Sequence, residues 1–322
     1  KPFTLLGKVI PEGKRTVIDL KIAKLHTRTT VNVPVIIEHS KKPGPVVLLL
    51  AGIHGDETNG VGIVREIINL KMNKPKNGTI ICIPVFNIFG YLVQTREFPD
   101  GRDLNRMFPG TLNGSLASQF AFQFSEKIAP YVDYVIDFHT GGGERDNISQ
   151  IRCNKDDTKG LELAKVFNPP IIVHSNTIIK SLRETLYKMG KTVLLFEGGK
   201  SLDLDRQVTH SGITGALNVL DYLGVKKFPK DYEPHIEKNK QVIFEDSIWV
   251  RAKYSGMYRS VIRNGSKIAK GDVIGLITDP YGFFERKVKA SKSGYVICLN
   301  HSSIVTQGDA IAHIAIVPIP QK

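Results

Sequence analysis

The sequence predicts an α/β protein with a mixed, mostly parallel sheet flanked by helices, followed by an all-β sandwich. Short apolar runs such as 46–52 alternate with helix-like segments such as 61–70. This alternation is typical of parallel sheets covered by helices. Beyond residue 228 no helical pattern remains, and 250–317 contains short strands punctuated by glycines. The length of 322 residues also suits two domains.

The expected elements follow in chain order. Residues 17–38 contain two β-rich runs and are expected to form an antiparallel edge of the sheet. The core strands are expected where short apolar runs end at glycine, proline or a polar cluster, at 46–52, 78–85, 134–139 and 192–196. The helices are expected where apolar residues recur at helical spacing, at 61–70, 116–131, 161–167, 182–189 and 213–223.

Composition excludes several classes of protein. Hydrophobic residues make up 41% of the chain and charged residues 23%, which is ordinary for a folded protein and excludes intrinsic disorder. No apolar run approaches the ~20 residues of a membrane helix, so no membrane partner is expected. The three cysteines form no zinc or redox motif and no apolar signal core is present, so a cytoplasmic location is expected. Whether a leader was removed before Lys1 stays open.

The net charge of +13 lies mainly at the two ends of the chain. Residues 1–50 carry +6 and residues 245–322 carry +5, whereas 51–244 carry only +2. Basic surfaces attract nucleic acid, but no basic run is interleaved with aromatic residues and no nucleic-acid-binding motif is present. We therefore expect a solvated basic surface and no nucleic-acid partner. A homo-oligomer stays open.

Polar residues at two strand ends point to a metal site. His54 and Glu57 follow the strand 46–52, and His139 ends the strand 134–139. Ligands bind outside the carboxyl ends of strands in open α/β sheets, so these side chains can reach one crevice. Two histidines, one glutamate and a water form an open zinc site of the catalytic type. The competing interpretation, that the histidines only pack and hydrogen-bond, is disfavoured because two such motifs occur together.

Two further motifs suggest a base and an anion clamp. Glu197 follows the apolar run 193–196 and precedes two glycines, a pattern that presents a carboxylate at a strand end. It is the predicted general base, which must take a proton from water. Asn105 and Arg106 could hold a substrate carboxylate, because guanidinium binds carboxylate in a fork and the amide adds a second contact.

Together these motifs resemble the succinylglutamate desuccinylase/aspartoacylase family, which has the zinc carboxypeptidase-like fold. The resemblance rests on His54-x-x-Glu57, Asp103-Leu-Asn-Arg106, His139 and Glu197 in this order, and it covers residues 46–224. Phe108-Pro109-Gly110 fits as well. The segment 87–90 departs from the family's Asn-Pro-x-Gly pattern, since isoleucine stands where the family often has proline.

The resemblance implies roles for these residues. It implies one zinc per chain on His54, Glu57 and His139, with Glu197 as general base and later acid. It implies that Asn105 and Arg106 hold the substrate carboxylate and that Asp103 orients the first zinc histidine. An upstream arginine usually polarises the scissile carbonyl in the family. By position this is Arg96, with Arg102 as the alternate and also a candidate for substrate binding.

The C-terminal region contains an internal near-repeat. Ser255-Gly256 precedes Gly271-Asp272 by 16 residues, and Ser293-Gly294 precedes Gly308-Asp309 by 15. Two such halves resemble the biotinyl/lipoyl-like sandwich. The carrier lysine of that family lies in a tight hairpin flanked by small residues or methionine, whereas residues 278–287 lack this motif. We therefore expect a structural module and no swinging-arm carrier.

The predicted function is a zinc-dependent amide hydrolase of the deacylase type. Its substrate would be a small N-acyl compound that carries a carboxylate. The alternatives are a metallocarboxypeptidase for short peptides and a non-catalytic binding protein of the same fold. The predicted domains are a zinc hydrolase domain at 1–228, a linker at 229–249 and the β-sandwich module at 250–322.

Overall fold

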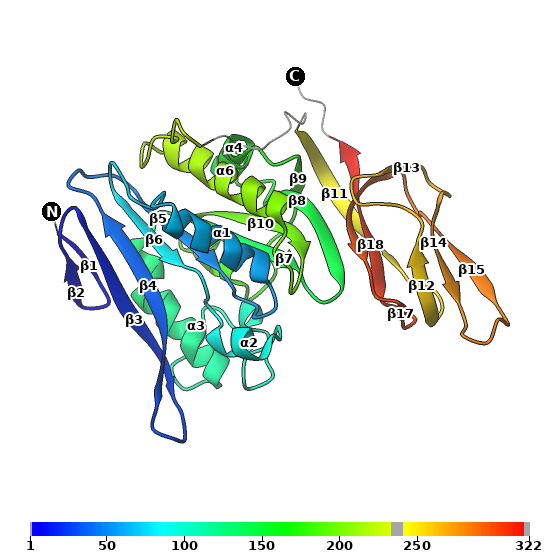
Figure 1. Ribbon diagram of the computed structural model, residues 1–322, viewed down its shortest axis with the longest axis horizontal. Helices are drawn as coiled ribbons and strands as arrows, with labels where there is room; N and C mark the ends of the chain where they lie inside the picture. Colours follow the sequence, from blue (N-terminus) through cyan, green and yellow to red (C-terminus); the bar gives the residue numbers. More distant parts are fainter. Residues whose placement is uncertain (1, 233–240, 319–322) are drawn as a thin grey trace.

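The computed structural model describes residues 2–232 and 241–318, and its main feature is one large mixed sheet (Figure 1). Its order is β13-β16-β18-β11-β9-β8-β10-β7-β5-β6-β4-β3. The strands from the first part of the chain are β3 (Lys14–Lys24), β4 (Thr30–His39), β5 (Val46–Ala51), β6 (Thr79–Ile83), β7 (Tyr134–Gly141), β8 (Arg145–Cys153), β9 (Ile171–His174) and β10 (Thr192–Lys200). A separate hairpin precedes them, formed by β1 (Phe3–Leu5) and β2 (Lys8–Ile10).

The centre of the sheet is parallel and its flanks are largely antiparallel. The strands β6, β5, β7 and β10 pair in parallel. On one side β4 and β3 pair antiparallel, which confirms the predicted edge at 17–38. On the other side β8 pairs antiparallel with β10. The prediction of a mostly parallel sheet therefore holds for the centre and not for the whole sheet.

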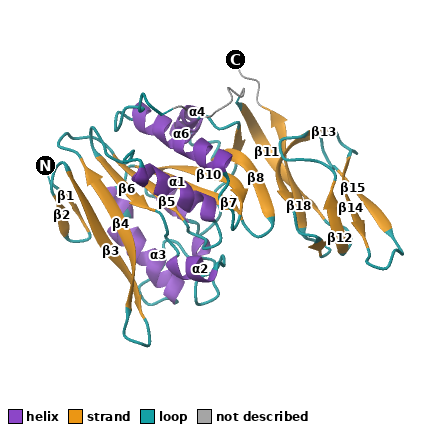
Figure 2. Cartoon of the chain, in the orientation of Figure 1, coloured by secondary structure: helices purple, strands orange, loops and turns teal. Residues whose placement is uncertain are grey.

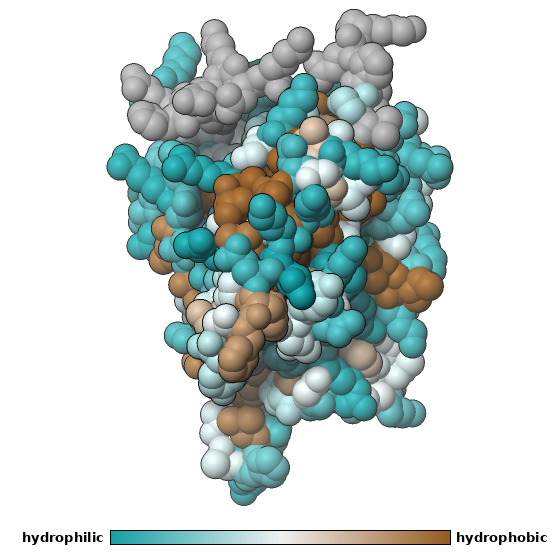
Figure 3. Space-filling view, turned by 90° about the vertical axis from the view of Figure 1, so that its right-hand side faces the viewer, coloured by the Kyte–Doolittle hydropathy of each residue, from teal (hydrophilic) through white to brown (hydrophobic). Residues whose placement is uncertain are grey.

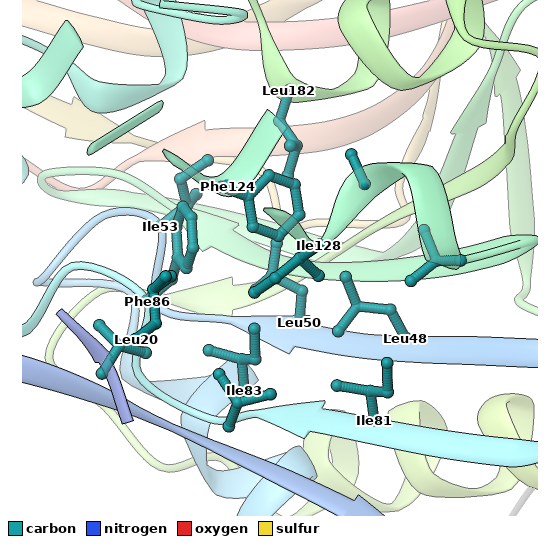
Figure 4. Packing of buried hydrophobic residues seen from close by; sticks show 14 of the residues in the cluster. Leu20, Leu48, Leu50, Ile53, Ile81, Ile83, Phe86, Phe124, Ile128 and Leu182 are labelled. Atoms are coloured by element: carbon teal, nitrogen blue, oxygen red, sulfur yellow. The ribbon is translucent and has the colours of Figure 1, made fainter. Parts of the chain in front are cut away.

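Successive side chains of a central strand point to opposite faces of the sheet, so the sheet packs against two cores. Leu48 and Leu50 of β5 point into one core, while Val47 and Leu49 point into the other, as expected where a strand is buried on both faces. Figure 4 shows the first core, where Leu48 and Leu50 meet Ile81, Ile83 and Phe124. The β-branched and aromatic residues of these runs suit such a doubly covered strand.

The helices divide between the two faces (Figure 2). The first core packs against α3 (Leu116–Lys127) and α5 (Leu182–Lys188), and the second against α1 (Thr58–Asn69), α4 (Thr158–Phe167) and α6 (Arg206–Tyr222). Short turns of helix occur at α2 (Ile88–Val93), η1 (Leu104–Arg106) and η2 (Ala129–Tyr131). Side-chain caps explain several starts: the hydroxyl of Ser115 accepts from the Ser118 N–H, and the carboxylate of Asp205 from the Val208 N–H.

The predicted elements of the first 224 residues are present, with shifted limits. The helix predicted at 116–131 ends at Lys127 and continues as a 3-10 turn, and the helix predicted at 213–223 begins earlier, at Arg206. The strand predicted at 192–196 runs on to Lys200. The strands β8 and β9 were not predicted.

The C-terminal strands close a ring with the first part of the chain. They are β11 (Val242–Arg251), β12 (Gly256–Ser260), β13 (Lys267–Ile268), β14 (Val273–Thr278), β15 (Glu285–Lys289), β16 (Gly294–Asn300), β17 (Ile304–Val305) and β18 (Ala310–Pro318). β11 pairs with β9, and β16 pairs with β8. Because β11 also pairs with β18, and β18 with β16, the strands β8, β9, β11, β18 and β16 form a closed circuit.

The remaining C-terminal strands form a second sheet, in the order β15-β14-β12-β17, which packs over a third apolar core. Figure 3 views this end of the molecule, where hydrophilic residues surround smaller hydrophobic groups. Phe283, in the turn between β14 and β15, is 86% exposed.

The strand β11 occupies part of the predicted linker 229–249, and residues 233–240 of that linker lie outside the described residues. The domain division therefore stays a prediction. In the described ranges, no helix is long and apolar enough to cross a bilayer.

Candidate metal centre and active site

The turn from β5 into α1 carries His54 and Glu57. The turn is tight: an added Cβ at Gly55 would lie 1.8 Å from the Gly90 carbonyl carbon, so only glycine fits there. Glu57 stands at the N-cap position of α1 but makes no side-chain cap. Its carboxylate is turned toward the histidines instead, and both His54 and Glu57 are 2% exposed.

His139 of β7 completes a group of three potential ligands. Potential ligand atoms of His54, Glu57 and His139 all lie within 4.8 Å of one another. The Nδ1 atom of His54 lies 2.7 Å from Glu57 Oε1, and the Nδ1 atom of His139 lies 2.9 Å from Glu57 Oε2. Two imidazoles and a carboxylate at this spacing form the donor set of an open zinc site, so the residues present fit the metal.

A carboxylate holds the far nitrogen of each histidine. Asp103 Oδ1 lies 3.1 Å from His54 Nε2, and Asp137 Oδ2 lies 2.9 Å from His139 Nε2. Such partners fix the ring orientation and leave Nδ1 as the ligand atom. The contact of Asp103 agrees with its predicted role, which stays a prediction. Asp137 was not predicted, although its place two residues before His139 on one strand face could have suggested it.

Buried charges raise the affinity of both histidines for protons. Burial acts to lower the pKa of His54, but Glu57 and Asp103 outweigh it and hold that pKa above its ordinary value. Burial likewise opposes Asp137 and Glu57 at His139, whose pKa stands well above its ordinary value. Burial would raise the pKa of Glu57, yet the two histidines hold it well below its usual range. The site therefore attracts a cation, and a divalent metal would replace the protons.

Glu197 faces the same cavity from β10. It pairs with His139 in the parallel register of β10 and β7. Its Oε2 accepts a hydrogen bond of 2.8 Å from Asn147 Nδ2, and its Oε1 lies 3.9 Å from Arg152 Nη2. The register of β10 and β8 shifts between Glu197 and Gly199. This irregularity brings Asn147 onto the face of the sheet that Glu197 occupies.

Arg96 lies directly beside the potential metal ligands. Its Nη1 is 3.4 Å from Glu57 Oε1, and its Nη2 donates to Asp103 Oδ2 at 2.8 Å. Arg102 lies apart from it: its side chain is 52% exposed, and its Nη1 lies 3.6 Å from Asp100 Oδ2. The cavity lining among the described residues includes Arg96 and excludes Arg102.

Asn105 and Arg106 line the cavity next to α5. The side-chain oxygen of Asn105 accepts from the Leu182 N–H at 2.9 Å, which leaves its NH2 group to act as a donor. The Nη1 atom of Arg106 donates to the Asn105 carbonyl at 2.7 Å, and the side chain is 40% exposed. Both residues can therefore reach the cavity, and their role in binding a carboxylate stays a prediction.

One cavity of about 460 Å³ is lined by the three potential metal ligands together with Arg96, Asp103, Asn105, Arg106 and Glu197. Arg102 excepted, the predicted site residues meet here, but their roles stay predictions. The lining also includes Arg145 and Arg183, which are the fallback candidates for the carboxylate clamp, and four residues that were not predicted: Asn147, Arg152, Trp249 and Cys298. Trp249 and Cys298 belong to β11 and β16, so the C-terminal strands supply part of the wall. Burial, with Arg152 close by, lowers the pKa of Arg183 to about 10.

Comparisons with known proteins agree with this fold. Residues 43–223 match the family described as succinylglutamate desuccinylase/aspartoacylase catalytic domain. The N-alpha-acetyl-L-2,4-diaminobutyric acid deacetylase of Halomonas elongata is 27% identical over 301 residues, which cover 88% of this chain and 86% of the relative.

Solved structures show the same fold. A succinylglutamate desuccinylase/aspartoacylase from Rhodobacter sphaeroides superposes with a TM-score of 0.85 at 23% identity, covering 97% of each chain. The ectoine utilization protein EutE (DoeB) from Ruegeria pomeroyi, solved with product bound, also gives 0.85, at 22% identity, covering 98% of this chain and 99% of that one. Both cover the C-terminal strands as well as the residues that match the catalytic domain.

Proposed function

Since this chain belongs to the succinylglutamate desuccinylase/aspartoacylase family, we propose that it is a zinc-dependent amide hydrolase that removes the acyl group from a small, carboxylate-bearing N-acyl compound. One observation carries the proposal: the buried group of His54, Glu57 and His139 shares a single cavity with a carboxylate, Glu197, on the adjacent strand. The relative from Halomonas elongata, named as a deacetylase of an N-acetylated amino acid, supports the same class of reaction.

The residues of the chain divide the chemistry between them. His54, Glu57 and His139 would hold the zinc, which when bound lowers the pKa of water and polarises a carbonyl group. Glu197 would accept the proton of the attacking water and later pass it to the leaving amine. Asn147 holds one carboxylate oxygen of Glu197 at 2.8 Å and so orients the base. Arg96 would donate to the carbonyl oxygen as it gains negative charge.

The charges of the cavity favour an anionic substrate. Arg96, Arg106, Arg145, Arg152 and Arg183 all line it. Arg96 is already paired with Asp103, but the guanidinium of Arg106 is partly exposed and lies 4.0 Å from the same aspartate. We assign the substrate carboxylate to Arg106 together with Asn105. The limited volume and the C-terminal wall favour small N-acyl amino acids over peptides.

We propose a structural role for the C-terminal region, treated as the module 250–322 beside the hydrolase domain 1–228. Two sheets around one apolar core, with the repeated Ser-Gly and Gly-Asp turns, support the resemblance to the biotinyl/lipoyl-like sandwich. Lys287 lies within β15 and pairs with Leu276 of β14. It is therefore not placed in a tight turn, where a carrier lysine would be expected.

The test is hydrolysis by the zinc-loaded protein of N-acyl amino acids and, in parallel, dipeptides. We expect release of the amino acid from N-acyl substrates. Glu197→Gln keeps the size and hydrogen bonding of the side chain but cannot take a proton. Its kcat should fall by a factor on the order of 10² to 10⁴, with zinc content unchanged. Faster cleavage of dipeptides would instead favour the carboxypeptidase alternative, and full activity of Glu197→Gln would remove the base assignment.

A further inference from the structure

Besides the potential metal ligands and Glu197, the cavity lining contains two groups of side chains, which we call walls. The first, the clamp wall, is formed by Asn105, Arg106 and Ser181, and it is tied to the start of α5 by the bond from Leu182 N–H to Asn105. The second, the ladder wall, is formed by Arg145, Asn147, Cys298 and Trp249. The two oxygens of Glu197 point to different neighbours, Oε2 to Asn147 of the ladder wall and Oε1 to Arg152.

Three residues of the ladder wall form, together with His313 behind them, a row of side chains across four strands. Trp249 of β11 is opposite His313 of β18, His313 is opposite Cys298 of β16, and Cys298 is opposite Asn147 of β8. Residues in register on neighbouring strands share one face of a sheet. This row therefore connects the C-terminal strands directly with the residue that holds Glu197.

The indole of Trp249 is fixed in this wall by two neighbours. Its ring lies parallel to the imidazole of His313, with centroids 4.2 Å apart and an angle of 6° between the planes. His313 is buried, and burial lowers its pKa to about 3, so a neutral imidazole supports the indole. The guanidinium carbon of Arg145 lies 5.9 Å from the centre of the indole.

Arg145 also connects Trp249 with the metal ligands. Its Nε donates to the carbonyl of Gly142 at 2.9 Å. A Cβ added at Gly142 would lie 3.9 Å from Arg145 Nη2, 3.2 Å from Arg96 Nη1 and 3.8 Å from Glu57 Oε1. The ladder wall thus begins beside Arg96 and Glu57, and the proposed function places the scissile carbonyl there.

We propose that Trp249 forms the floor of an acyl subsite and limits the enzyme to short acyl groups, with Arg145 and His313 as positioning residues. The inference rests on the proposed function. In an N-acyl amino acid the carboxylate and the acyl chain leave the amide bond on opposite sides. When Asn105 and Arg106 hold the carboxylate, the acyl chain points to the ladder wall. A rigid aromatic wall at that place selects by length, because a longer chain meets the indole.

The first test measures kcat/KM for N-acetyl, N-butyryl and N-hexanoyl derivatives of one amino acid. The wild type should prefer acetyl. Trp249→Ala should shift the ratio of hexanoyl to acetyl by a factor on the order of tenfold or more, the usual effect of reshaping an apolar pocket. Phe283→Ala, which removes an exposed aromatic of the C-terminal strands that does not line the cavity, is the control and should leave the ratio unchanged. An equal effect of Trp249→Ala on all three substrates would overturn the proposal.

Positioning by Arg145 has its own readout. Arg145→Met removes the charge beside the indole and should move the same ratio in the direction of Trp249→Ala, while Arg145→Lys should restore part of it. A merely structural role would lower all rates together and leave the ratio unchanged.

The second test needs no turnover, because Trp249 is the single tryptophan of the chain. Acetate, butyrate and glycine are added separately to zinc-loaded Glu197→Gln protein while tryptophan emission is followed. Acetate and butyrate, which correspond to the acyl part of the substrate, should change the emission. Glycine, which corresponds to the amino acid part, should not. An equal change of emission with glycine and with the two acyl probes, or no change with any of the three, would overturn the subsite. If the acids alter emission but the wild type hydrolyses no N-acyl amino acid, the proposed function fails and the binding subsite stands.

Discussion

At the scale of single residues, the metal ligands are held from behind by carboxylates. Asp103 and Asp137 each contact the Nε2 atom of one histidine. We expect about one zinc per chain in the wild type, as in the predicted site. His54→Ala or His139→Ala should lose it, because two remaining ligands bind zinc weakly. Elemental analysis checks this, with His26→Ala in the exposed turn between β3 and β4 as the control. Equal zinc in all four proteins would contradict the assignment.

Zinc binding should also depend on pH. The metal binds neutral imidazole, and the pKa values of His54 and His139 in the metal-free protein are raised. Protons should therefore displace zinc, as the pH falls, at a higher pH than at ordinary histidines, whose pKa is about 6.5. Zinc titration against a chelating dye between pH 5 and 8 measures this, with the dye's own pH dependence subtracted.

The same shifts predict the stability of the metal-free protein. A group whose pKa is raised on folding contributes stability that is complete below its unfolded pKa and is lost as pH rises through the folded value. The melting temperature of chelated protein should therefore fall from about pH 6.5 upward, because His54 and His139 lose their protons beside Glu57. The zinc-loaded protein should lack this fall. A melting temperature of the chelated protein that rises over the same range would contradict the sign.

Arg106 offers a test of binding separate from chemistry. Arg106→Ala should raise KM for carboxylate-bearing substrates. The increase should correspond to a loss of roughly 2–5 kcal/mol of binding free energy if the bound contact is buried. Arg106→Lys should rescue only part, because an ammonium group cannot form the two-pronged contact. Substrates without the carboxylate should be poor for the wild type and indifferent to Arg106→Ala. Equal losses on both substrate types would make Arg106 structural.

The residues predicted from the sequence and those missed differ in a physical way. His54, Glu57, His139 and Glu197 follow or end apolar strands, so the pattern places them at one edge of a parallel sheet. Asn147 comes onto the face of Glu197 only because the register of β8 and β10 shifts, and an alternating pattern cannot reveal such a shift. Trp249 reaches the cavity through pairings between strands far apart in sequence.

At the scale of elements, the turn between β5 and α1 depends on Gly55. A Cβ there would meet backbone atoms of Gly90 and Tyr91, which cannot rotate away as a side chain could. Gly55→Ala should therefore lower both the melting temperature and zinc affinity, because the turn carries His54 and Glu57. Calorimetry and zinc titration of the variant would show it.

Gly62→Ala in α1 is the matched control. Its added methyl group meets the Cδ2 atom of the exposed Leu204 at 3.1 Å and, in ordinary contact, Thr209 Oγ1 at 3.9 Å. Replacing glycine by alanine within a helix is usually stabilising by about 0.5–1 kcal/mol. If Gly55→Ala were as stable as Gly62→Ala and bound zinc as well, the close approach would not matter for the site.

The elements that the sequence predicted have either a continuous apolar run or apolar residues at helical spacing. The run 46–52 is wholly apolar and became β5, and α3 has Phe120 and Phe124 on its buried stripe. The strand β8 was missed because its sequence, RDNISQIRC, has polar residues where it faces the cavity. A strand that lines a polar site lacks the apolar alternation by which strands are recognised.

At the scale of the whole molecule, the ring of β8, β9, β11, β18 and β16 joins the two predicted domains. A chain that ends at residue 241 would lose β11, β16 and β18, and so the partners of β8 and β9. It would expose Ile171 and Val173, which pack against Phe244, and it would lack Trp249. We expect this shortened chain to aggregate and to be inactive, since unpaired strand edges promote association. Gel filtration and an activity assay are the measurements.

The control for this truncation replaces two exposed side chains and keeps every strand. Phe283→Gly and Tyr281→Gly change only exposed residues of the turn between β14 and β15 and should leave solubility and activity unchanged. A monomeric, active protein from residues 1–241 would instead show that the predicted hydrolase domain folds without the ring.

The closed ring also orders events during synthesis. Asn147 pairs with Cys298, about 150 positions later in the chain, and Cys298 pairs with His313. Contacts so distant in sequence form late, because the intervening chain must first leave the ribosome. The wall beside Glu197 therefore cannot be built until β16 and β18 have been translated. A nascent chain would carry its potential metal ligands long before it had a finished cavity, and catalysis would begin only after β18 has joined the ring.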